Sequence, residues 1–186
     1  MNTLWNGDNV KYFTSDSHYN HANILKSCNR PFENVWEMNA RMIKIWNDTV
    51  NPRDEVYHLG DFAYPKNNAY GMPIDEIIDK LHGQITLIRG CHDRYVKKYE
   101  HLFHQVKDLA YIKLSSGDKC MLCHYPMRTW RASHYGSFML HGHSHCQIKP
   151  VGKMMDVGVD CWNFRPISEH EVVGVMEGRE ENENML

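Results

Sequence analysis

Five short segments of the sequence share one design, in which an apolar run is followed directly by histidine, aspartate or cysteine. The clearest is the run 85–89, which predicts a buried strand and leads into the turn Gly90-Cys91-His92-Asp93. The other four segments are residues 12–18, 56–61, 121–124 and 138–145. Because ligands bind at the carboxyl ends of strands in open α/β sheets, this design predicts a shared site at those ends. Five such segments in order indicate a site for more than one metal ion.

The side chains in these segments suit a hydrolytic two-metal site. The candidates are Asp16, His18, Asp61, Cys91, His92, His124, His143 and His145. Two-metal sites hold their ions roughly 3.5–4 Å apart and need a bridging ligand, which a carboxylate such as Asp61 can provide. Nitrogen and oxygen donors fit Mn²⁺, Fe²⁺, Co²⁺, Ni²⁺ or Zn²⁺ and do not choose among them. Water held between two cations ionises near neutral pH, and the cations also neutralise the charge of a phosphate group.

The order of the motifs resembles that of the calcineurin-like metallophosphoesterase family. The blocks are Asp-x-His, Gly-Asp, Gly-x-His-Asp, His and Gly-His-x-His, and they run in order from Asp16 to His145. The resemblance implies an α/β fold, a layered sandwich of two mixed β-sheets flanked by helices. The coarse pattern of strands and helices along the chain agrees with that fold.

The resemblance also implies a role for each candidate. One metal would be held by Asp16, His18, Asp61 and His145, and the second by Asp61, position 91, His124 and His143. His92 would act as a general acid or bind phosphate, with Asp93 orienting its ring. Outside the motifs, Arg30 and Arg131 are candidates to grip a phosphate. Ordinary surface ion pairs are an equally good interpretation of these two arginines.

Position 91 departs from the family pattern, because Cys91 stands where the family has asparagine. A thiolate ligand would add a negative charge, favour soft ions such as Zn²⁺ and reduce the Lewis acidity of the second metal. Three interpretations stay open. Cys91 is a ligand in a variant site, a bystander beside a weak second site, or a replacement that inactivates the enzyme.

The expected function is a dinuclear metal-dependent phosphodiesterase acting on a small nucleotide or similar diester. A metal-bridged hydroxide would be the nucleophile, His92 would assist the leaving oxygen, and Mn²⁺ is the first choice of metal. An alternative of another class is a metal-binding interaction module with reduced or no turnover because of Cys91. A second alternative is a nuclease, which the net charge of −2 makes less favoured without excluding nucleic acid as a partner.

The composition is that of one ordinary domain. The chain has 186 residues, of which 42% are apolar, and we expect a single domain over 1–177. The acidic tail 178–186 is expected to be disordered. No apolar run reaches the length of about 18 residues that suggests a membrane span, and the N-terminus lacks a signal pattern. We therefore expect no membrane partner and a cytoplasmic location.

Six cysteines lie at positions 28, 91, 120, 123, 146 and 161. In a chain expected to be intracellular they are predicted to be free thiols. Cys120 and Cys123 have the spacing of a zinc knuckle, but no second pair accompanies them. Their odd separation on a strand would also send the two sulfurs to opposite faces.

Periodicity and capping residues predict the main elements. Strands are expected at 10–15, 55–59, 85–89, 105–114, 119–124, 138–141 and 153–159, with 105–114 and 119–124 forming a hairpin. Helices are expected at 21–25, 34–49, 73–81, 94–103 and 168–177. Asn34 with Glu37, and Ser168 with Glu171, have the spacing of capping boxes.

Overall fold

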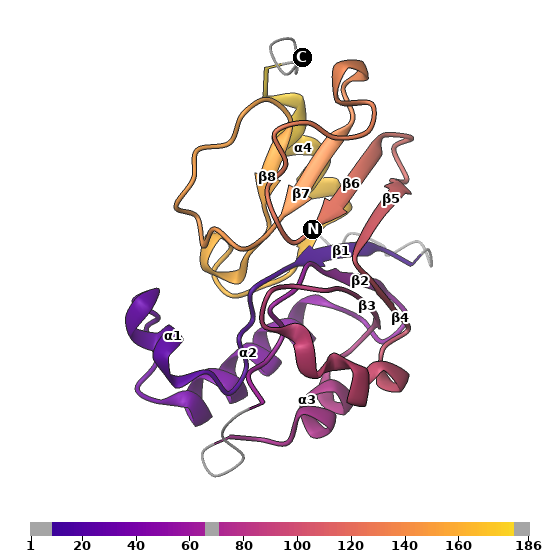
Figure 1. Cartoon of the computed structure of the whole chain (residues 1–186). Helices are drawn as coiled ribbons and strands as arrows, with labels where there is room; N and C mark the ends of the chain where they lie inside the picture. Colours follow the sequence, from indigo (N-terminus) through magenta and orange to yellow (C-terminus); the bar gives the residue numbers. More distant parts are fainter. Residues whose placement is uncertain (1–8, 66–70, 181–186) are drawn as a thin grey trace, which may run out of the picture.

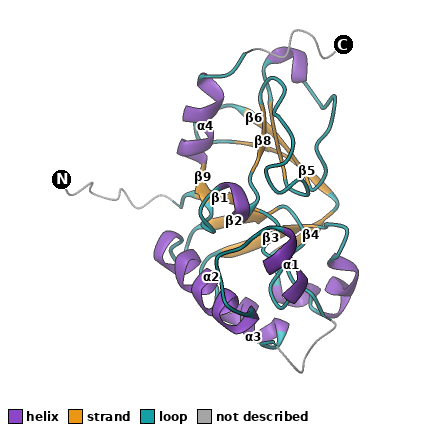
Figure 2. Ribbon diagram, turned by 90° about the vertical axis from the view of Figure 1, so that its left-hand side faces the viewer, coloured by secondary structure: helices purple, strands orange, loops and turns teal. Residues whose placement is uncertain are grey.

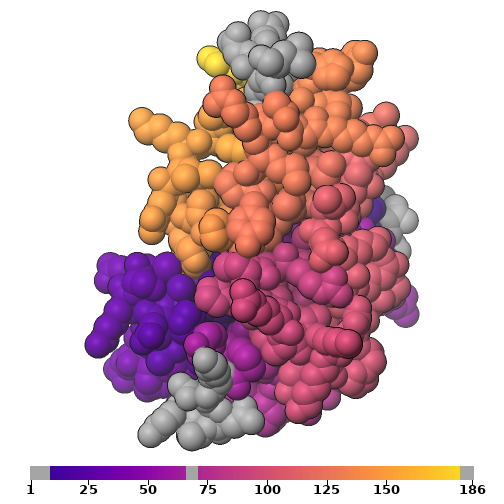
Figure 3. All heavy atoms as spheres, viewed as in Figure 1, coloured from indigo at the N-terminus to yellow at the C-terminus, as the bar shows by residue number. Residues whose placement is uncertain are grey.

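Two β-sheets with flanking helices make up the computed structural model, which describes residues 9–65 and 71–180 (Figure 1). The first sheet crosses the middle of the view with α1, α2 and α3 below it, and the second sheet lies above (Figures 1 and 2). The space-filling view shows the earlier part of the chain in the lower half and the later part in the upper half (Figure 3). The predicted α/β sandwich of two mixed sheets is confirmed.

The first sheet has the strand order β4-β3-β2-β1-β9 among the described residues. Its strands are β1 (Lys11–Thr14), β2 (Glu55–His58), β3 (Gln84–Ile88), β4 (Gln105–Lys107) and β9 (Ile167–Ser168). Strands β1 to β4 are parallel, whereas β9 is antiparallel to β1. Because parallel strands end at the same edge, the segments that follow β1, β2 and β3 meet there.

The second sheet has the strand order β5-β6-β7-β8 in the described part of the chain. Its strands are β5 (Leu109–Lys113), β6 (Lys119–Cys123), β7 (Phe138–His141) and β8 (Met154–Asp156). Strands β6, β7 and β8 are parallel, and β5 forms the predicted hairpin with β6. The ends of β6 and β7 therefore deliver their following residues to one edge, as in the first sheet.

Of the four α-helices in the described residues, α2 and α4 begin where the capping residues predict. The helices are α1 (Ala22–Ser27), α2 (Val35–Thr49), α3 (Ile74–Lys80) and α4 (Glu169–Glu177). Asn34 Oδ1 accepts the Glu37 N–H at 3.0 Å at the start of α2. Ser168 and Glu171 form a complete capping box at the start of α4.

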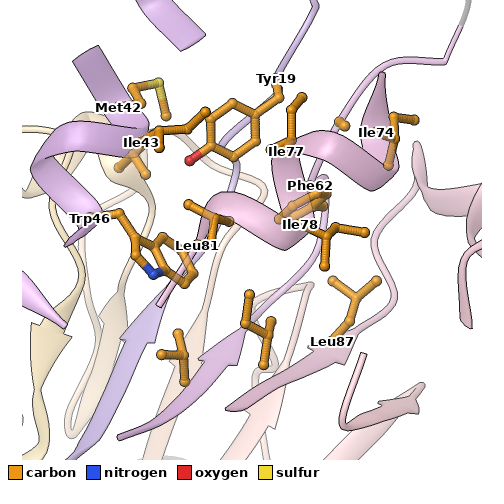
Figure 4. Close-up of a cluster of buried hydrophobic side chains, with 14 of the residues drawn as sticks. Tyr19, Met42, Ile43, Trp46, Phe62, Ile74, Ile77, Ile78, Leu81 and Leu87 are labelled. Carbon is orange, nitrogen blue, oxygen red and sulfur yellow. The ribbon is translucent and has the colours of Figure 1, made fainter. Parts of the chain in front are cut away.

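Helices α2 and α3 cover one face of the first sheet with apolar side chains (Figure 4). Met38, Met42 and Trp46 recur at helical spacing on α2 and are at most 2% exposed. Burying each such side chain contributes roughly 1.5–3 kcal/mol to folding. This core fixes the helices against the sheet and so supports the strand ends that carry the site.

A second core lies between the two sheets and includes residues of α4. Its members include Phe13, Leu59, Ile88, Leu122, Leu140, Val172 and Met176. Cys120 belongs to this core, whereas Cys123 packs in a separate cluster with Trp130 on the other face of the second sheet. The opposite orientation predicted for these two thiols is confirmed, so they do not form a zinc knuckle.

Two predicted elements are wrong in detail. The stretch 105–114 is not one strand, because β4 joins the first sheet and β5 the second. Between them Asp108 is exposed and ion-paired with Arg89, which marks the crossing from one sheet to the other. The stretch 94–103 forms two 3₁₀ turns, Asp93–Lys98 and Glu100–Leu102, instead of an α-helix. The first turn starts at Asp93, whose buried carboxylate accepts backbone N–H groups from neighbouring loops. These hydrogen bonds fix the geometry of the turn.

The prediction of six free thiols is also wrong. Cys146 and Cys161 form a disulfide, with Cα atoms 5.6 Å apart. The fold brings the loop after β7 beside the 3₁₀ turn Val159–Cys161, a proximity that the spacing in the sequence does not reveal. The free cysteines are Cys28, Cys91, Cys120 and Cys123.

Among the described residues, no helix has the length and apolar character that crossing a bilayer requires. The predicted disordered tail lies outside the described residues from position 181 onward. The single-domain boundary and the cytoplasmic location stay predictions.

Candidate metal centre

Two clusters of candidate metal ligands lie at the carboxyl ends of the strands, and a third group among the described residues, Cys28, His145 and Asp160, overlaps one of them. In the described ranges, the Asp16 cluster consists of Asp16, His18 and His145, and the Cys91 cluster of Asp61, Cys91, His124 and His143. Within each cluster the ligand atoms lie within 4.8 Å of one another. The structure thus brings together all seven residues predicted to ligate metal, from segments that follow strands of both sheets.

Asp61 lies between the two clusters. Its Oδ2 atom is 3.7 Å from His18 Nε2 and 3.5 Å from His124 Nε2. The same oxygen accepts the Cys91 thiol at 3.2 Å. One carboxylate oxygen that faces both clusters is what a bridging ligand requires.

Buried ligand atoms without hydrogen-bond partners show that the site fits cations. Asp16 Oδ1, His18 Nε2 and His124 Nε2 are buried and have no partner within the described structure. Leaving one buried polar atom unpaired costs about 1–3 kcal/mol. Burial raises the pKa of Asp16 to about 8 and lowers that of His18 far below its ordinary value. A divalent cation would give each of these atoms a partner and offset the burial of the carboxylate.

The backbone at most of the ligands is in the left-handed region. The φ angles are 57° at Asp16, 49° at His18, 54° at Asp61, 67° at His143 and 46° at His145. Non-glycine residues held this way cost of order 1–3 kcal/mol each and persist only where the surrounding structure enforces them. Their concentration at the site indicates that the loops are shaped for ligand placement at the expense of stability.

Two glycines permit the close approach of these loops. A Cβ atom on Gly90 would lie 2.3 Å from Asp61 Oδ1, and one on Gly142 would lie 2.4 Å from Asp16 Oδ2. Neither oxygen can retreat, because Asp61 Oδ1 accepts the His92 N–H and Asp16 Oδ2 accepts the His143 N–H. The glycines of the Gly-x-His-Asp and Gly-His-x-His motifs therefore make room for the carboxylates.

A buried ion pair orients His145. Its Nδ1 atom is 2.7 Å from Asp160 Oδ2, and Arg30 makes two contacts of 2.8 and 2.9 Å with the same carboxylate. Arg30 also donates to the carbonyls of Asp16 and Ser17. Carboxylates paired with ligating histidines fix the ring and its tautomer. Asp160 was not predicted, although it follows an apolar strand as the other site residues do.

The position of Arg30 corrects its expected role. Its side chain is fully buried, and its guanidinium is occupied by Asp160 and by backbone carbonyls. It therefore holds the loop after β1 in place and does not offer its donors to a phosphate. Arg131 is exposed and its guanidinium lies over the ring of Tyr111, 4.6 Å from the centroid, and its role in phosphate binding stays a prediction.

Two further histidine ligands are held through their second ring nitrogen. His124 Nδ1 is 2.8 Å from the Leu59 carbonyl oxygen, so Nδ1 carries the proton and Nε2 is a free acceptor. His18 Nδ1 is 3.1 Å from His21 Nδ1, and the His21 ring stacks on Tyr64. In both residues the nitrogen that faces the centre is Nε2.

His92 lies at the open side of the centre. Its side chain is 43% exposed, and its Nε2 atom is 4.0 Å from Asp61 Oδ2. A cavity of about 530 Å³ opens beside it, lined by Tyr64, Pro65, Cys91, His92, Arg94 and Tyr95. An exposed imidazole next to a cavity can reach a bound ligand.

Asp93 does not orient the His92 ring as the resemblance implied. Its carboxylate is 2% exposed and accepts the backbone N–H groups of Gly90, Asp61 and Phe62 at 2.8 to 3.0 Å. The Tyr95 hydroxyl donates to it at 3.4 Å. Asp93 thus ties the loop after β3 to the loop after β2, and its effect on His92 passes through the backbone.

A two-sheet α/β fold with clusters of candidate metal ligands at its strand ends is the arrangement that the sequence motifs imply for a metallophosphoesterase. Residues 12–158 match the model of the calcineurin-like phosphoesterase superfamily domain. The chain therefore belongs to this superfamily, whose members are metal-dependent phosphoesterases.

Similar proteins cover nearly the whole chain. The uncharacterized protein MJ1445 of Methanocaldococcus jannaschii is 38% identical over 173 residues, which is 89% of this chain and 90% of that protein. The Gene 66 protein of Mycobacterium phage L5 is 26% identical over 204 residues, covering 94% and 97%. The crystal structure of AQ665 from Aquifex aeolicus, a protein of unknown function, superposes on this structure with a TM-score of 0.70 at 23% sequence identity. The superposition covers 90% of this chain and 100% of that one. This last likeness supports the fold.

Proposed function

We propose that the protein is a phosphodiesterase whose two clusters hold two divalent transition-metal ions. The observation that carries the proposal is the set of unpartnered, buried atoms around Asp61, namely Asp16 Oδ1, His18 Nε2 and His124 Nε2. His18 Nε2 of one cluster and His124 Nε2 of the other lie 3.7 and 3.5 Å from Asp61 Oδ2, which suits a pair of ions that share this oxygen as a ligand. Mn²⁺ is the first expectation, with Fe²⁺, Zn²⁺, Ni²⁺ or Co²⁺ as the other candidates.

The chain contributes positioning and proton transfer to this reaction. When bound, the cations supply an ionised water and neutralise charge on the phosphate oxygens. Asp61 and Asp16 offer the carboxylate oxygens of the two clusters, and Asp160 orients the His145 ring through its hydrogen bond with Nδ1. His92, exposed beside the cavity, donates a proton to the leaving oxygen of the diester.

The open cavity beside His92 supports a small diester as substrate. Tyr64, Tyr95 and Pro65 give it apolar walls, and Arg94 adds a cation at the same place. Aromatic walls suit the base of a nucleotide through stacking. A small nucleotide diester is therefore our first choice of substrate.

The test is a panel of metals and substrates with an Asp61→Ala variant. Protein stripped of metal is supplied with each candidate ion and assayed on bis(p-nitrophenyl) phosphate and on p-nitrophenyl phosphate. We expect metal-dependent hydrolysis, faster for the diester. Asp61→Ala should lose bound metal and at least about 10³-fold in rate, since it faces both clusters. Near-parental turnover of this variant with both ions bound would refute the two-metal proposal.

Cys91 favours one second candidate, a metal-binding interaction module. If its thiolate lowers the Lewis acidity of the second ion too far, the centre would bind metal without turnover. Full metal occupancy with no hydrolysis of either aryl phosphate would support this candidate over the phosphodiesterase.

A further inference from the structure

The two clusters of the metal centre differ in the chemistry of their donors. The Asp16 cluster offers one carboxylate and two imidazoles, whereas the Cys91 cluster adds a sulfur atom to a carboxylate and two imidazoles. Carboxylates and imidazoles accept a broad range of ions, while thiolate selects Zn²⁺ and other soft or borderline ions. The centre is therefore asymmetric in its donors, although Asp61 of the Cys91 cluster also faces His18 of the Asp16 cluster.

The Cys91 sulfur lies beside the Asp61 carboxylate and the His143 ring of its cluster. The Sγ atom is 3.2 Å from Asp61 Oδ2 and 4.0 Å from His143 Nδ1. The turn that carries it is fixed, because Asp93 holds the Gly90 N–H at 2.8 Å and Asp61 Oδ1 holds the His92 N–H at 2.8 Å. The thiol therefore faces the centre without any rearrangement of the backbone.

An independent observation indicates that this cluster takes a cation. His124 is 0% exposed, its Nδ1 is bound to the Leu59 carbonyl, and its Nε2 faces the cluster with no partner. This nitrogen is an acceptor, so the nearby Asp61 carboxylate cannot satisfy it, and no donor among the described residues lies within hydrogen-bond distance. A metal ion does, and the same ion would be in reach of the Cys91 sulfur.

We propose that the Cys91 cluster is a thiolate site selective for a soft or borderline divalent ion, with Zn²⁺ as the natural occupant. The Asp16 cluster takes a harder ion such as Mn²⁺, so the centre is built for two different metals. This inference rests on the proposed function, because it assigns the ions of that same centre. It adds that the Cys91 sulfur binds one ion directly and gives the two clusters different metal preferences.

Cobalt spectroscopy tests the sulfur bond directly. Apoprotein kept under inert gas without added thiols is titrated with Co²⁺, whose bond to thiolate gives a charge-transfer band in the near ultraviolet. We expect the band in the parent, saturating with a single equivalent, and no band in Cys91→Ser or Cys91→Asn. Both variants should still bind Co²⁺ at the Asp16 cluster. Cys91 is only partly buried in a turn, so neither change removes core packing.

Cys28→Ser is the matched control. Cys28 is the other free thiol near the centre, since its sulfur lies within 4.8 Å of ligand atoms of His145 and Asp160. We expect this variant to keep the parental band. A band that persists in Cys91→Ser, a band lost in Cys28→Ser, or two equivalents of Co²⁺ bound to the parent without any band would each overturn the proposal.

Competition between metals tests the selectivity. Zn²⁺ binds most nitrogen, oxygen and sulfur sites more tightly than Mn²⁺, so the informative quantity is the change caused by Cys91→Asn. Losing a residue that hydrogen-bonds a metal ligand typically costs about 10–100-fold in metal affinity. Losing the Cys91 sulfur itself should lower the Zn²⁺ affinity of the Cys91 cluster by at least as much. Parent and Cys91→Asn are dialysed against the same mixture of the two ions, and Cys91→Asn should hold less Zn²⁺ and more Mn²⁺ than the parent. Equal metal content in the two proteins would contradict the inference.

The outcomes separate this inference from the proposed function. A parent that shows the thiolate band but hydrolyses no diester with any metal would refute the phosphodiesterase and leave the thiolate site standing. A parent that hydrolyses diesters with Mn²⁺ in both halves, with no thiolate band, would refute the inference alone. Failure of the parent to bind Co²⁺ at all would overturn both.

Discussion

His92 differs from the buried histidines of the centre in its surroundings. Its side chain is 43% exposed beside the cavity, whereas those of His18 and His124 are 3% and 0% exposed. An imidazole that stays in contact with solvent can exchange its proton during turnover. This placement makes His92 the residue to test for proton transfer.

His92→Ala should keep the metal and slow hydrolysis of an alkyl diester by about 10²–10⁴-fold, the usual contribution of a general acid. The loss should shrink for an aryl diester, because an aryl leaving group needs no proton. The measurement is the rate of parent and variant on the two substrates, with metal content determined in parallel. Equal losses on both substrates would show that His92 binds phosphate instead.

Asp160→Asn should weaken metal binding at the Asp16 cluster by about 10–100-fold, the typical effect of losing a carboxylate behind a ligating histidine. The reason is that Asp160 holds both His145 and the buried Arg30 guanidinium. Metal affinity measured by chelator competition provides the check. Asp48→Asn, which removes an exposed carboxylate paired with Lys44, is the control and should change nothing. Unchanged affinity in Asp160→Asn would mean that His145 needs no such support.

At the scale of elements, Glu169 joins the start of α4 to two other parts of the fold. The residue is 2% exposed, and its carboxylate accepts the Ser115 N–H at 2.7 Å and the Ser115 hydroxyl at 2.9 Å. It also accepts the Lys11 N–H of β1 at 3.3 Å. One side chain thus links α4, the β5–β6 turn and the first strand.

Glu169→Gln should lower the free energy of unfolding by about 1–3 kcal/mol near pH 7, the usual loss when a buried acceptor is impaired. Burial alone would raise the pKa of Glu169, but the hydrogen bonds from Ser115 and Lys11 lower it overall. Because the folded-state pKa lies below the unfolded value of 4.5, this stabilisation is complete above 4.5 and is lost as the pH falls through the folded pKa. Urea unfolding of parent and variant near neutral pH and in acid provides the measurement. A difference that does not shrink in acid would contradict the assignment.

The sequence predicts those elements whose local signals agree with the fold. Asn34 and Ser168 mark the starts of α2 and α4, because capping is a local interaction. The division of 105–114 between β4 and β5 could not be predicted, since nothing in an apolar strand says which sheet it joins.

The candidate site is predictable in its ligands and not in its supports. The candidate ligands are carried by spaced motifs, and all seven lie in the two clusters of the structure. The supporting roles of Asp160, Arg30 and Asp93 depend on contacts between distant segments. The left-handed backbone at residues such as Asp16 and His143 is equally hidden, because the fold enforces it and the residue types do not.

At the scale of the whole molecule, the Cys146–Cys161 disulfide is open to a direct count. Denatured, unreduced protein should give four reactive thiols with a thiol reagent, from Cys28, Cys91, Cys120 and Cys123. Prior reduction should raise the count to all six cysteines. Six thiols before reduction would show that Cys146 and Cys161 are unpaired in the isolated protein.

The hydrogen bond from the His143 N–H to Asp16 Oδ2 joins residues that are 127 positions apart. During synthesis on the ribosome, Asp16 and His18 emerge early, but their cluster lacks its last ligand until His145 has left the exit tunnel. The Asp16 cluster therefore cannot take its final geometry until the segment after β7 has been synthesised. A chain that ends before His145 would lack the complete Asp16 cluster, even if strands β1 to β4 and helices α1 to α3 had formed.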